Sequence, residues 1–311
     1  MSALAEAVAD YLELRRSFGY KLDEAGRLLP RFVVYLDSVG ADVVTIENAV
    51  AWAQQPQAAP GTTVWAARMS VARGFARYLA GIDARTQVPP PGLISSPRRR
   101  RNPFIYTAAD ITSLQLEAQR QIPTPLRAAT VATVIGLLGA TGMRVGEVLR
   151  LDRDDIDWDD AVIWVRQTKF NKQRLLPLHP TTVAALAGYA TQRDQLLRSA
   201  PKTPGFFVST VGTRLIYVNL NLTFKKLVDG AGIARGSAVT GRIHDLRHSS
   251  AVRTLLEWYR QGDDVQACLP WLSTYLGHRE PRYTYTYLSA IPELLAIAAE
   301  RLESSTPAVW P

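Results

Sequence analysis

Residues 128–147, AATVATVIGLLGATGMRVGE, join an apolar run to a glycine-rich turn. The run over 128–140 predicts a buried helix that stops at Gly139 and Gly142, because glycine ends helices readily. A second helix is expected to begin near Val145. The stretch therefore predicts a mainly helical domain in which a buried helix is followed by a tight turn.

Arg144 falls in this turn, and Glu147 comes three residues later. Residues at this spacing meet on one helix face, so the carboxylate can orient the guanidinium. Taken alone, the pattern fits equally an arginine that caps a helix, forms an ion pair or is solvated.

The surroundings of this stretch complete the domain. Thr107 and Asp110 have capping-box spacing, which marks a helix start and the beginning of the domain. Residues 161–166 and 173–178 alternate apolar and polar side chains on either side of a polar loop, which predicts a β-hairpin. The chain beyond the hairpin is expected to be mainly helical, so the domain combines helices with a small antiparallel sheet.

The front half predicts a separate helical domain. Its helices are expected around residues 4–15, 25–39, 46–54 and 63–79, with breaks at glycine- and proline-rich positions. In the last of them a stripe of apolar residues faces the core, which leaves Arg68, Arg73 and Arg77 as candidate DNA-binding residues or as ordinary solvated arginines.

Between the two halves lies a basic, proline-rich segment. Residues 1–95 carry nine basic and nine acidic side chains, whereas residues 96–103 add four arginines and no acid. Arg98, Arg99, Arg100 and Arg101 suit a phosphate backbone that passes between two domains, although a solvated charge run has the same composition. We expect a helical domain over 1–88, a linker over 89–104 and a second domain over 105–311.

Composition excludes several classes of protein. The 47% hydrophobic and 21% charged residues are typical of globular chains. No apolar run reaches the roughly 18 residues of a membrane helix, and the first residues lack a signal-peptide pattern, so we expect a cytoplasmic protein. One cysteine and four histidines give no zinc-ligand spacing, so neither a metal nor a cofactor is expected. The net charge of +8 favours an anionic partner.

Further ionisable residues of the second half recur in small groups. His244 and Arg247 are three residues apart, so on a helix they can grip one phosphate together. His278 follows an expected helix end, and Tyr287 comes nine residues later. Each group alone has ordinary structural interpretations, and His248 is interpreted as structural.

Together these residues resemble the tyrosine recombinase, or phage integrase, family over about residues 105–301. The matching segments, in the family's order, are TGMRVGE (141–147), TKFNKQRLLPL (168–178), HDLRH (244–248), LGH (276–278) and TYL (286–288). The front half is similar to the family's helical, SAM-like core-binding domain in architecture only. The resemblance therefore implies two domains that clamp duplex DNA.

The resemblance also implies a site. Tyr287 is the nucleophile that forms a 3′-phosphotyrosyl bond, so no nucleotide hydrolysis is needed to reseal the strand. Arg144, Arg247, His244 and His278 act on the phosphate in the transition state. Lys169 is the general acid, with Lys172 in the same loop as the alternative and as a DNA-binding candidate.

Some assignments stay open within the resemblance. Tyr275, Tyr283 and Tyr285 lie near Tyr287, and any of these tyrosines could be a core aromatic, although the family's spacing from His278 favours Tyr287 as the nucleophile. The segment between Arg247 and His278 is longer than in the simplest members and is similar to that of transposon- and plasmid-associated integrases. Residues 291–301 predict an amphipathic tail helix, which packs on its own domain or on a neighbouring protomer.

The implied function is site-specific recombination for integration, excision or transposition of a mobile element. The implied partners are double-stranded DNA that carries a specific recombination site and further copies of the chain, which form a homotetramer on paired sites. Accessory proteins are possible partners. No membrane is involved, and the protein is expected at the nucleoid. Two alternatives share the fold: a type IB topoisomerase, and a DNA-binding protein without catalysis.

Overall fold

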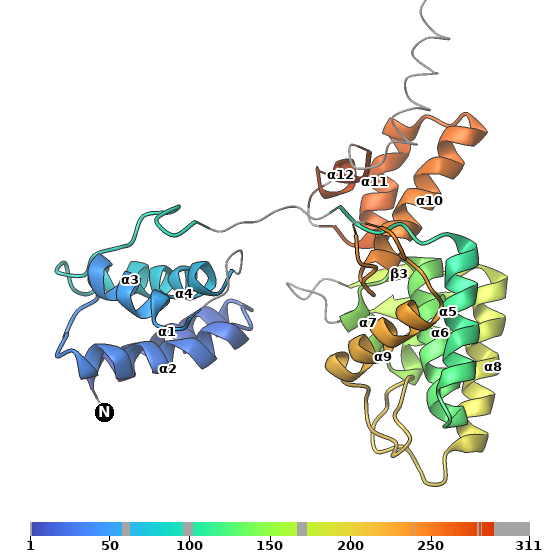
Figure 1. Cartoon of the computed structure of the whole chain (residues 1–311), viewed down its shortest axis with the longest axis horizontal. Helices are drawn as coiled ribbons and strands as arrows, with labels where there is room; N and C mark the ends of the chain where they lie inside the picture. Colours follow the sequence, from blue (N-terminus) through green and yellow to red (C-terminus); the bar gives the residue numbers. More distant parts are fainter. Residues whose placement is uncertain are drawn as a thin grey trace, which may run out of the picture. The chain divides into compact units, whose positions relative to one another are not determined.

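The computed structural model describes residues 2–57, 63–95, 102–166, 173–237, 239–278, 280 and 282–288, without the side chains of 286–288. The chain divides into two compact units, Met1–Arg100 and Arg101–Pro311 (Figure 1). Each unit has its own hydrophobic core.

The first unit is built from four helices. They are α1 (Ala3–Ser17), α2 (Asp23–Ser38), α3 (Ile46–Gln54) and α4 (Val64–Leu79). Phe32, Trp52 and Phe75 are completely buried between them, and Thr45 caps α3 by accepting a hydrogen bond from the backbone N–H of Asn48. The four predicted helices are confirmed, with ends that differ by at most two residues from those expected.

The beginning of the expected linker packs on this first unit. Arg73 on α4 donates from Nε to the carbonyl of Pro89 at 2.8 Å and from Nη2 to that of Pro90 at 3.0 Å. Ile94 packs against the same core. Residues 96–101, with Arg98 to Arg101, lie outside the described residues, so the domain boundaries stay a prediction.

The second unit opens with the predicted cap. Thr107 and Asp110 form a reciprocal capping box at the start of α5 (Ala108–Gln121). The buried helix follows as α6 (Pro125–Thr141), which lies beside α5 and α8 (Pro180–Leu196) (Figure 1). Both elements are therefore confirmed.

The prediction that the buried helix stops at Gly139 is wrong, since α6 continues to Thr141 and ends at Gly142. Gly142 has φ +63, a left-handed conformation that glycine adopts without strain. A Cβ at Gly139 would lie 2.8 Å from Cδ1 of Ile111 on α5. The glycine at 139 thus permits close helix packing, whereas the glycine at 142 ends the helix.

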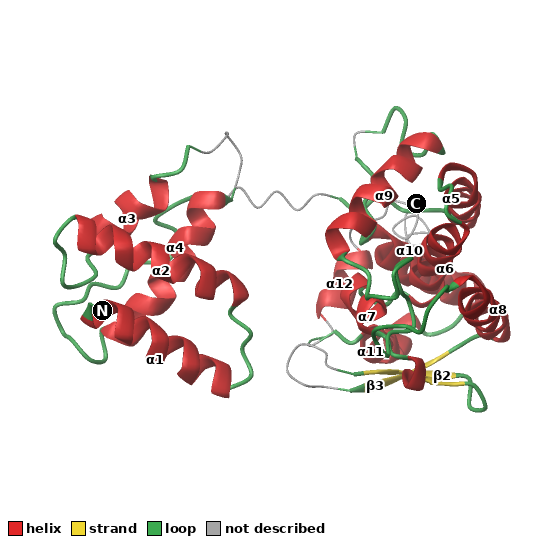
Figure 2. Ribbon diagram, turned by 90° about the horizontal axis from the view of Figure 1, so that it is seen from below, coloured by secondary structure: helices red, strands yellow, loops and turns green. Residues whose placement is uncertain are grey.

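The predicted hairpin is confirmed within a three-stranded antiparallel sheet. β1 (Ile156–Asp157), β2 (Val162–Val165) and β3 (Arg174–Pro177) pair in the order β1-β2-β3, and β2 and β3 lie at one edge of the unit (Figure 2). The hairpin loop, 167–172, holds Lys169 and Lys172 and lies outside the described residues. The pairing of Val165 with Arg174 fixes the register of the hairpin.

The remainder of the unit is mainly helical, as expected. After α7 (Val145–Arg150), the turn η1 (Arg153–Asp155) and the sheet, the described helices are α8, α9 (Tyr217–Gly230), α10 (Asp245–Gln261), α11 (Val265–Leu276) and α12 (Arg282–Leu288). α10 and α11 fill the long segment between Arg247 and His278 and bury Leu255, Leu269 and Leu272 between them. The expected tail helix, 291–301, lies outside the described residues. None of the described helices is long and apolar enough to span a bilayer.

Candidate active site

The turn after α6 fixes the first arginine. Arg144 is the residue before α7, and its backbone N–H donates to Glu147 Oε2 at 2.9 Å while its Nη1 donates to Oε1 at 2.8 Å. Glu147 is buried, whereas 39% of the Arg144 side chain is exposed. The contact expected from the spacing is therefore present, and Glu147 holds a guanidinium that still reaches solvent.

Arg247 enters the same region from the first turn of α10. It is only 3% exposed and donates from Nη1 to the carbonyl of Gly142 and from Nη2 to that of Leu276, both at 2.7 Å. Two residues earlier, the fully buried Asp245 accepts three hydrogen bonds from Arg242. The start of α10 is thus tied to the ends of both α6 and α11.

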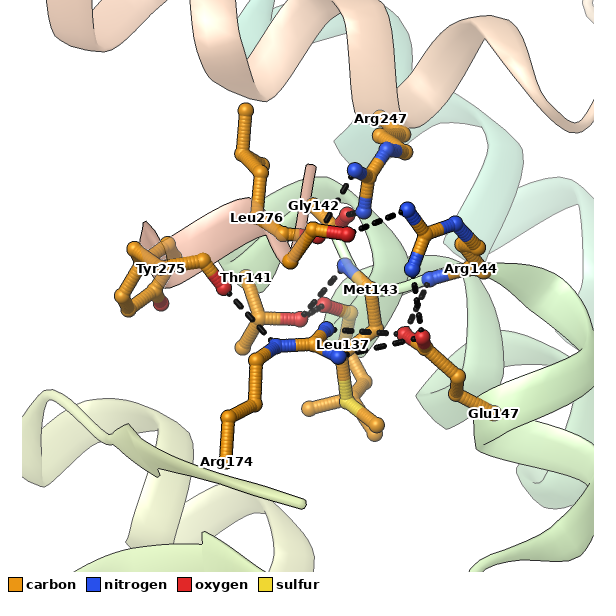
Figure 3. Close-up of polar contacts among 11 residues, drawn as sticks. Leu137, Thr141, Gly142, Met143, Arg144, Glu147, Arg174, Arg247, Tyr275 and Leu276 are labelled. Atoms are coloured by element: carbon orange, nitrogen blue, oxygen red, sulfur yellow. Dashed lines mark hydrogen bonds and ion pairs between the residues drawn. The ribbon is translucent and has the colours of Figure 1, made fainter. Parts of the chain in front are cut away.

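Three arginines bind three consecutive carbonyls at the end of α11 (Figure 3). Arg174 donates to Tyr275 at 2.9 Å, Arg247 to Leu276 at 2.7 Å and Arg144 to Gly277 at 2.7 Å. The last carbonyls of a helix have no partner within it and carry partial negative charge, so cations are favourable there. The arginines come from a strand, a helix and a turn, and this helix end brings them together.

His278 follows directly. Gly277 has φ +67, and the backbone N–H of His278 donates to the carbonyl of Ser273 at 2.9 Å, which closes the helix end. The His278 Nδ1 lies 2.8 Å from the hydroxyl of Thr284 on α12. The arginine-bound turn thus sets the place from which this imidazole projects.

Burial and the surrounding arginines lower the pKa values of two histidines in the site. Burial, and then the charges of Arg247 and Arg144, lower the pKa of His278 to about 3. Desolvation by neighbouring protein and then the charge of Arg247 lower the pKa of His244 as well, although part of this residue is exposed. At neutral pH both imidazoles can therefore donate one hydrogen bond and accept another.

Glu147 is ionised for a related reason. Burial alone would raise its pKa, but the hydrogen bonds and charges of Arg174 and Arg144 outweigh burial and lower that pKa to about 2. A carboxylate without these partners would be costly at this depth. The site therefore contains a fixed negative charge between two guanidinium groups.

Helix α12 carries the expected nucleophile. Tyr287 lies in α12 one turn after Thr284, and its side chain is outside the described part of the structure. The ring of Tyr283 packs edge-on toward His278, with centroids 6.4 Å apart, and Tyr285 is 48% exposed. The helix that contacts His278 through Thr284 therefore includes the backbone of Tyr287.

The first unit holds the other described candidates, all on α4. Arg68 donates to the carbonyl of Trp52 at 2.7 Å and lies over its ring at 3.8 Å, and Arg73 binds the carbonyls after α4. Arg77 is exposed. The structure thus gives Arg68 and Arg73 local partners within their own unit.

Sequence reasoning missed Arg174. Its side chain is 10% exposed and donates to both oxygens of Glu147, at 3.1 and 2.8 Å. Strand alternation puts Arg174 on the same face as the buried Leu176, and a charged residue on the buried face of a strand was the available signal.

Comparison with known proteins decides the family, because the sequence pattern of the phage integrase family matches residues 107–293. The chain belongs to this family. It is 40% identical over 309 residues, 97% of this chain and 98% of the relative, to y4rB of Sinorhizobium fredii, a protein named as an integrase/recombinase. It is 33% identical to the tyrosine recombinase XerD of Mycobacterium tuberculosis, with 73% of this chain and 70% of the relative covered.

Solved structures of the integrase family share the fold. The Tn1549 transposon integrase, in complex with transposon right end DNA, matches with a TM-score of 0.62 at 16% identity, over 96% of this chain and 99% of that one. XerH recombinase bound to its difH substrate matches with a TM-score of 0.60 at 18% identity, over 83% and 71%. The family match and the XerD relative identify this chain as a tyrosine-type site-specific recombinase. Among its described residues, no three His, Cys, Asp or Glu side chains gather as a metal site.

Proposed function

We propose that this recombinase moves a mobile element by cleaving and rejoining duplex DNA through a 3′-phosphotyrosyl bond to Tyr287. The observation that carries the proposal is that Arg144 and Arg247 bind the end of α11 directly before His278, while His244 precedes α10, three residues before Arg247. Arginine and lysine alone would suffice to bind DNA. Two neutral histidines beside two guanidinium groups favour phosphoryl transfer instead.

The reaction follows from these groups. The Tyr287 oxygen attacks phosphorus while its hydroxyl proton passes to a neutral imidazole, that of His244 or His278. The Oη–P bond forms and the P–O5′ bond breaks, while Lys169 gives its proton to the departing 5′ oxygen. Arg144 and Arg247 stabilise the charge that develops on the nonbridging oxygens. His244 and His278 add hydrogen bonds to the same transition state.

The rest of the chain has a place in the same proposal. A helical, SAM-like core-binding domain over 1–88, a basic linker over 89–104 and a catalytic domain over 105–311 would clamp the duplex. Two compact units support this division. We place the protein in the cytoplasm with the nucleoid, where its DNA lies.

Relatives suggest the assembly and the biological context. A solved neighbour with a TM-score of 0.54 and 15% identity is a λ integrase tetramer bound to a Holliday junction, which supports a homotetramer on paired sites here. The Tn1549 complex with transposon right end DNA supports a mobile element. A tail helix over 291–301 would then dock on a neighbouring protomer, with accessory proteins as additional partners.

The test is a covalent-adduct assay. Duplex DNA from the junctions that flank the gene, nicked next to the candidate cleavage position, is incubated with wild type or Tyr287→Phe and separated under denaturing conditions. Wild type is expected to give a protein–DNA adduct and Tyr287→Phe none. Binding without an adduct from either protein would overturn the proposal in favour of a DNA-binding protein.

A topoisomerase is distinguished by a second substrate. Wild type is expected to exchange strands between two DNAs that carry the site, in a reaction whose rate depends on protein concentration because several protomers must assemble. Relaxation of supercoiled plasmid without strand exchange, at a rate that depends on one bound monomer, would indicate type IB topoisomerase activity instead.

A further inference from the structure

We propose that Arg174 is a positioning residue of the recombination site, which sets Arg144 and His278 through Glu147 and the last turn of α11. The proposal rests on the proposed function and adds to it a residue that does not itself contact the phosphate.

All three guanidinium nitrogens of Arg174 are engaged. Nη1 and Nη2 donate to the two oxygens of Glu147 at 3.1 and 2.8 Å, and Nε donates to the carbonyl of Tyr275 at 2.9 Å (Figure 3). The planar fork of arginine matches a carboxylate in this two-bond geometry, and lysine has no equivalent. With only 10% of the side chain exposed, these contacts hold the guanidinium in one place.

Glu147 passes this constraint to Arg144. Each carboxylate oxygen is shared: Oε1 accepts from Nη1 of both arginines, and Oε2 accepts from the Arg144 backbone and from Nη2 of Arg174. Removing Arg174 would leave a buried carboxylate with one guanidinium partner and with room to turn. Because Arg144 is held by that carboxylate, its guanidinium would shift as well.

The end of α11 passes the constraint to His278. A Cβ at Gly277 would lie 2.8 Å from Nη1 of Arg174, so the guanidinium packs directly on the backbone that precedes His278. Arg174 binds the carbonyl of Tyr275, and Arg144 binds that of Gly277. One arginine outside the phosphate site therefore bears on two groups that act within it.

This geometry predicts that changes at Arg174 affect the cleavage rate separately from the stability of the fold. A positioning residue changes the rate of cleavage in the bound complex, whereas a residue that only braces the fold changes stability and leaves the rate of the folded protein alone. Arg174→Lys keeps the charge and loses the fork. Arg174→Met loses both, and Arg153→Met, which breaks the partly exposed pair of Arg153 with Asp194, is the matched control.

The experiment measures three quantities for each variant: unfolding in denaturant, affinity for the nicked duplex, and the single-turnover rate of adduct formation at saturating protein. For Arg174→Lys we expect a folded protein with unchanged DNA affinity and a cleavage rate about 10- to 100-fold lower, the size of effect that small misplacement of a reacting group produces. Arg153→Met should cleave at the wild-type rate.

A double variant tests the route through Glu147. If Arg174 acts in part through that carboxylate, Glu147→Gln combined with Arg174→Met should be slowed by less than the product of the two single effects, whereas independent effects would multiply. Multiplied effects would overturn the proposal. So would a wild-type rate from folded Arg174→Lys, or the unfolding of both Arg174 variants. Absence of an adduct from wild type would instead count against the proposed function.

Discussion

Two regions in which arginine side chains bind backbone carbonyls, the end of α11 and helix α4, offer different surroundings. At the end of α11, Arg144, Arg174 and Arg247 bind three consecutive carbonyls beside His278. On α4, Arg68 binds the carbonyl of Trp52 at 2.7 Å and stacks on its ring. The first group comes from three distant segments, and the second joins neighbouring parts of one helical unit.

The contrast shows when an arginine bound to a backbone carbonyl indicates a functional site. Carbonyl contacts fix a guanidinium in both regions, so the contact alone says nothing about function. At the end of α11, burial and then the charges of Arg247 and Arg144 lower the pKa of His278 to about 3. Arg144 and Arg174 also lie on either side of the ionised Glu147. On α4 Arg68 contacts the carbonyl and ring of Trp52, and after burial the charge of a second cation, Arg31, lowers its pKa. Anchoring together with a histidine and a carboxylate is what indicates chemistry.

The largest effect is expected from Arg247→Lys. Lysine keeps the charge but cannot donate in parallel to Gly142 and Leu276 while also contacting a phosphate. We expect the single-turnover cleavage rate to fall about 10²- to 10³-fold, as for loss of a donor in other transition states, with DNA binding retained.

The control for this prediction is Arg85→Lys, which changes an exposed arginine paired with Asp42 and Asp83 in the first unit and should leave cleavage unaltered. If Arg247→Lys cleaved at the wild-type rate, the arginines at α11 would be equivalent to those on α4, and the contrast between the two regions would be lost.

A second test concerns the cation expected to complete the α11 site, Lys169. Lys169→Ala should slow cleavage about 10²-fold, because the 5′ oxygen leaves without a proton donor. DNA in which sulfur replaces the bridging 5′ oxygen should restore most of the rate, since a thiolate is a far better leaving group than an alkoxide. Lys172→Ala is the matched control in the same loop. Rescue of Lys172→Ala rather than Lys169→Ala would reverse the assignment.

Much of the fold could be predicted because its signals are local. Helical periodicity, the Thr107 cap and the alternating strands lie within short windows, and the structure confirms them. Gly139 was misjudged because its role depends on Ile111, 28 positions earlier in the chain and on another helix. The two-residue strand β1 is too short for any periodicity.

The site could be predicted in part for a different reason. Residues that act on a phosphate are restricted to few types, and their order resembles a known family, so Arg144, His244, Arg247 and His278 could be selected. The contacts that hold these side chains in place could not be predicted. The pairing of Arg174 with Glu147 crosses 27 positions and that of Arg144 with the Gly277 carbonyl crosses 133, and neither leaves a local pattern.

A third prediction concerns His248, the histidine of α10 next to Arg247. Burial, and then the charge of His244, lower the pKa of His248 to about 4. The unfolded chain has a value near 6.5 and binds more protons between these limits, so stability is lost as the pH falls below about 6.5. This single group should cost about 2 kcal/mol of unfolding free energy between pH 7 and pH 5.

The test is denaturant unfolding of wild type and His248→Gln at both pH values. The variant should lose about 2 kcal/mol less than wild type, because glutamine does not titrate. Surface histidine His179, which caps α8, provides the control as His179→Asn, a residue that also caps helices. Equal pH dependence in wild type and His248→Gln would mean that burial and the charge of His244 do not perturb this imidazole.

The smallest effects separate two arginines of α4. Arg68→Ala removes a carbonyl hydrogen bond and a ring contact, so the first unit should lose about 1 kcal/mol of stability while the salt dependence of DNA binding stays the same. Arg77→Ala changes an exposed residue, so stability should stay the same. If Arg77 contacts a phosphate, the slope of log K against log salt should fall by about 0.9. If the slope fell for Arg68→Ala and stayed the same for Arg77→Ala, Arg68 would leave Trp52 to bind DNA. An arginine anchored to a carbonyl on α4 could then also bind phosphate, as is proposed for Arg144 and Arg247 at the end of α11.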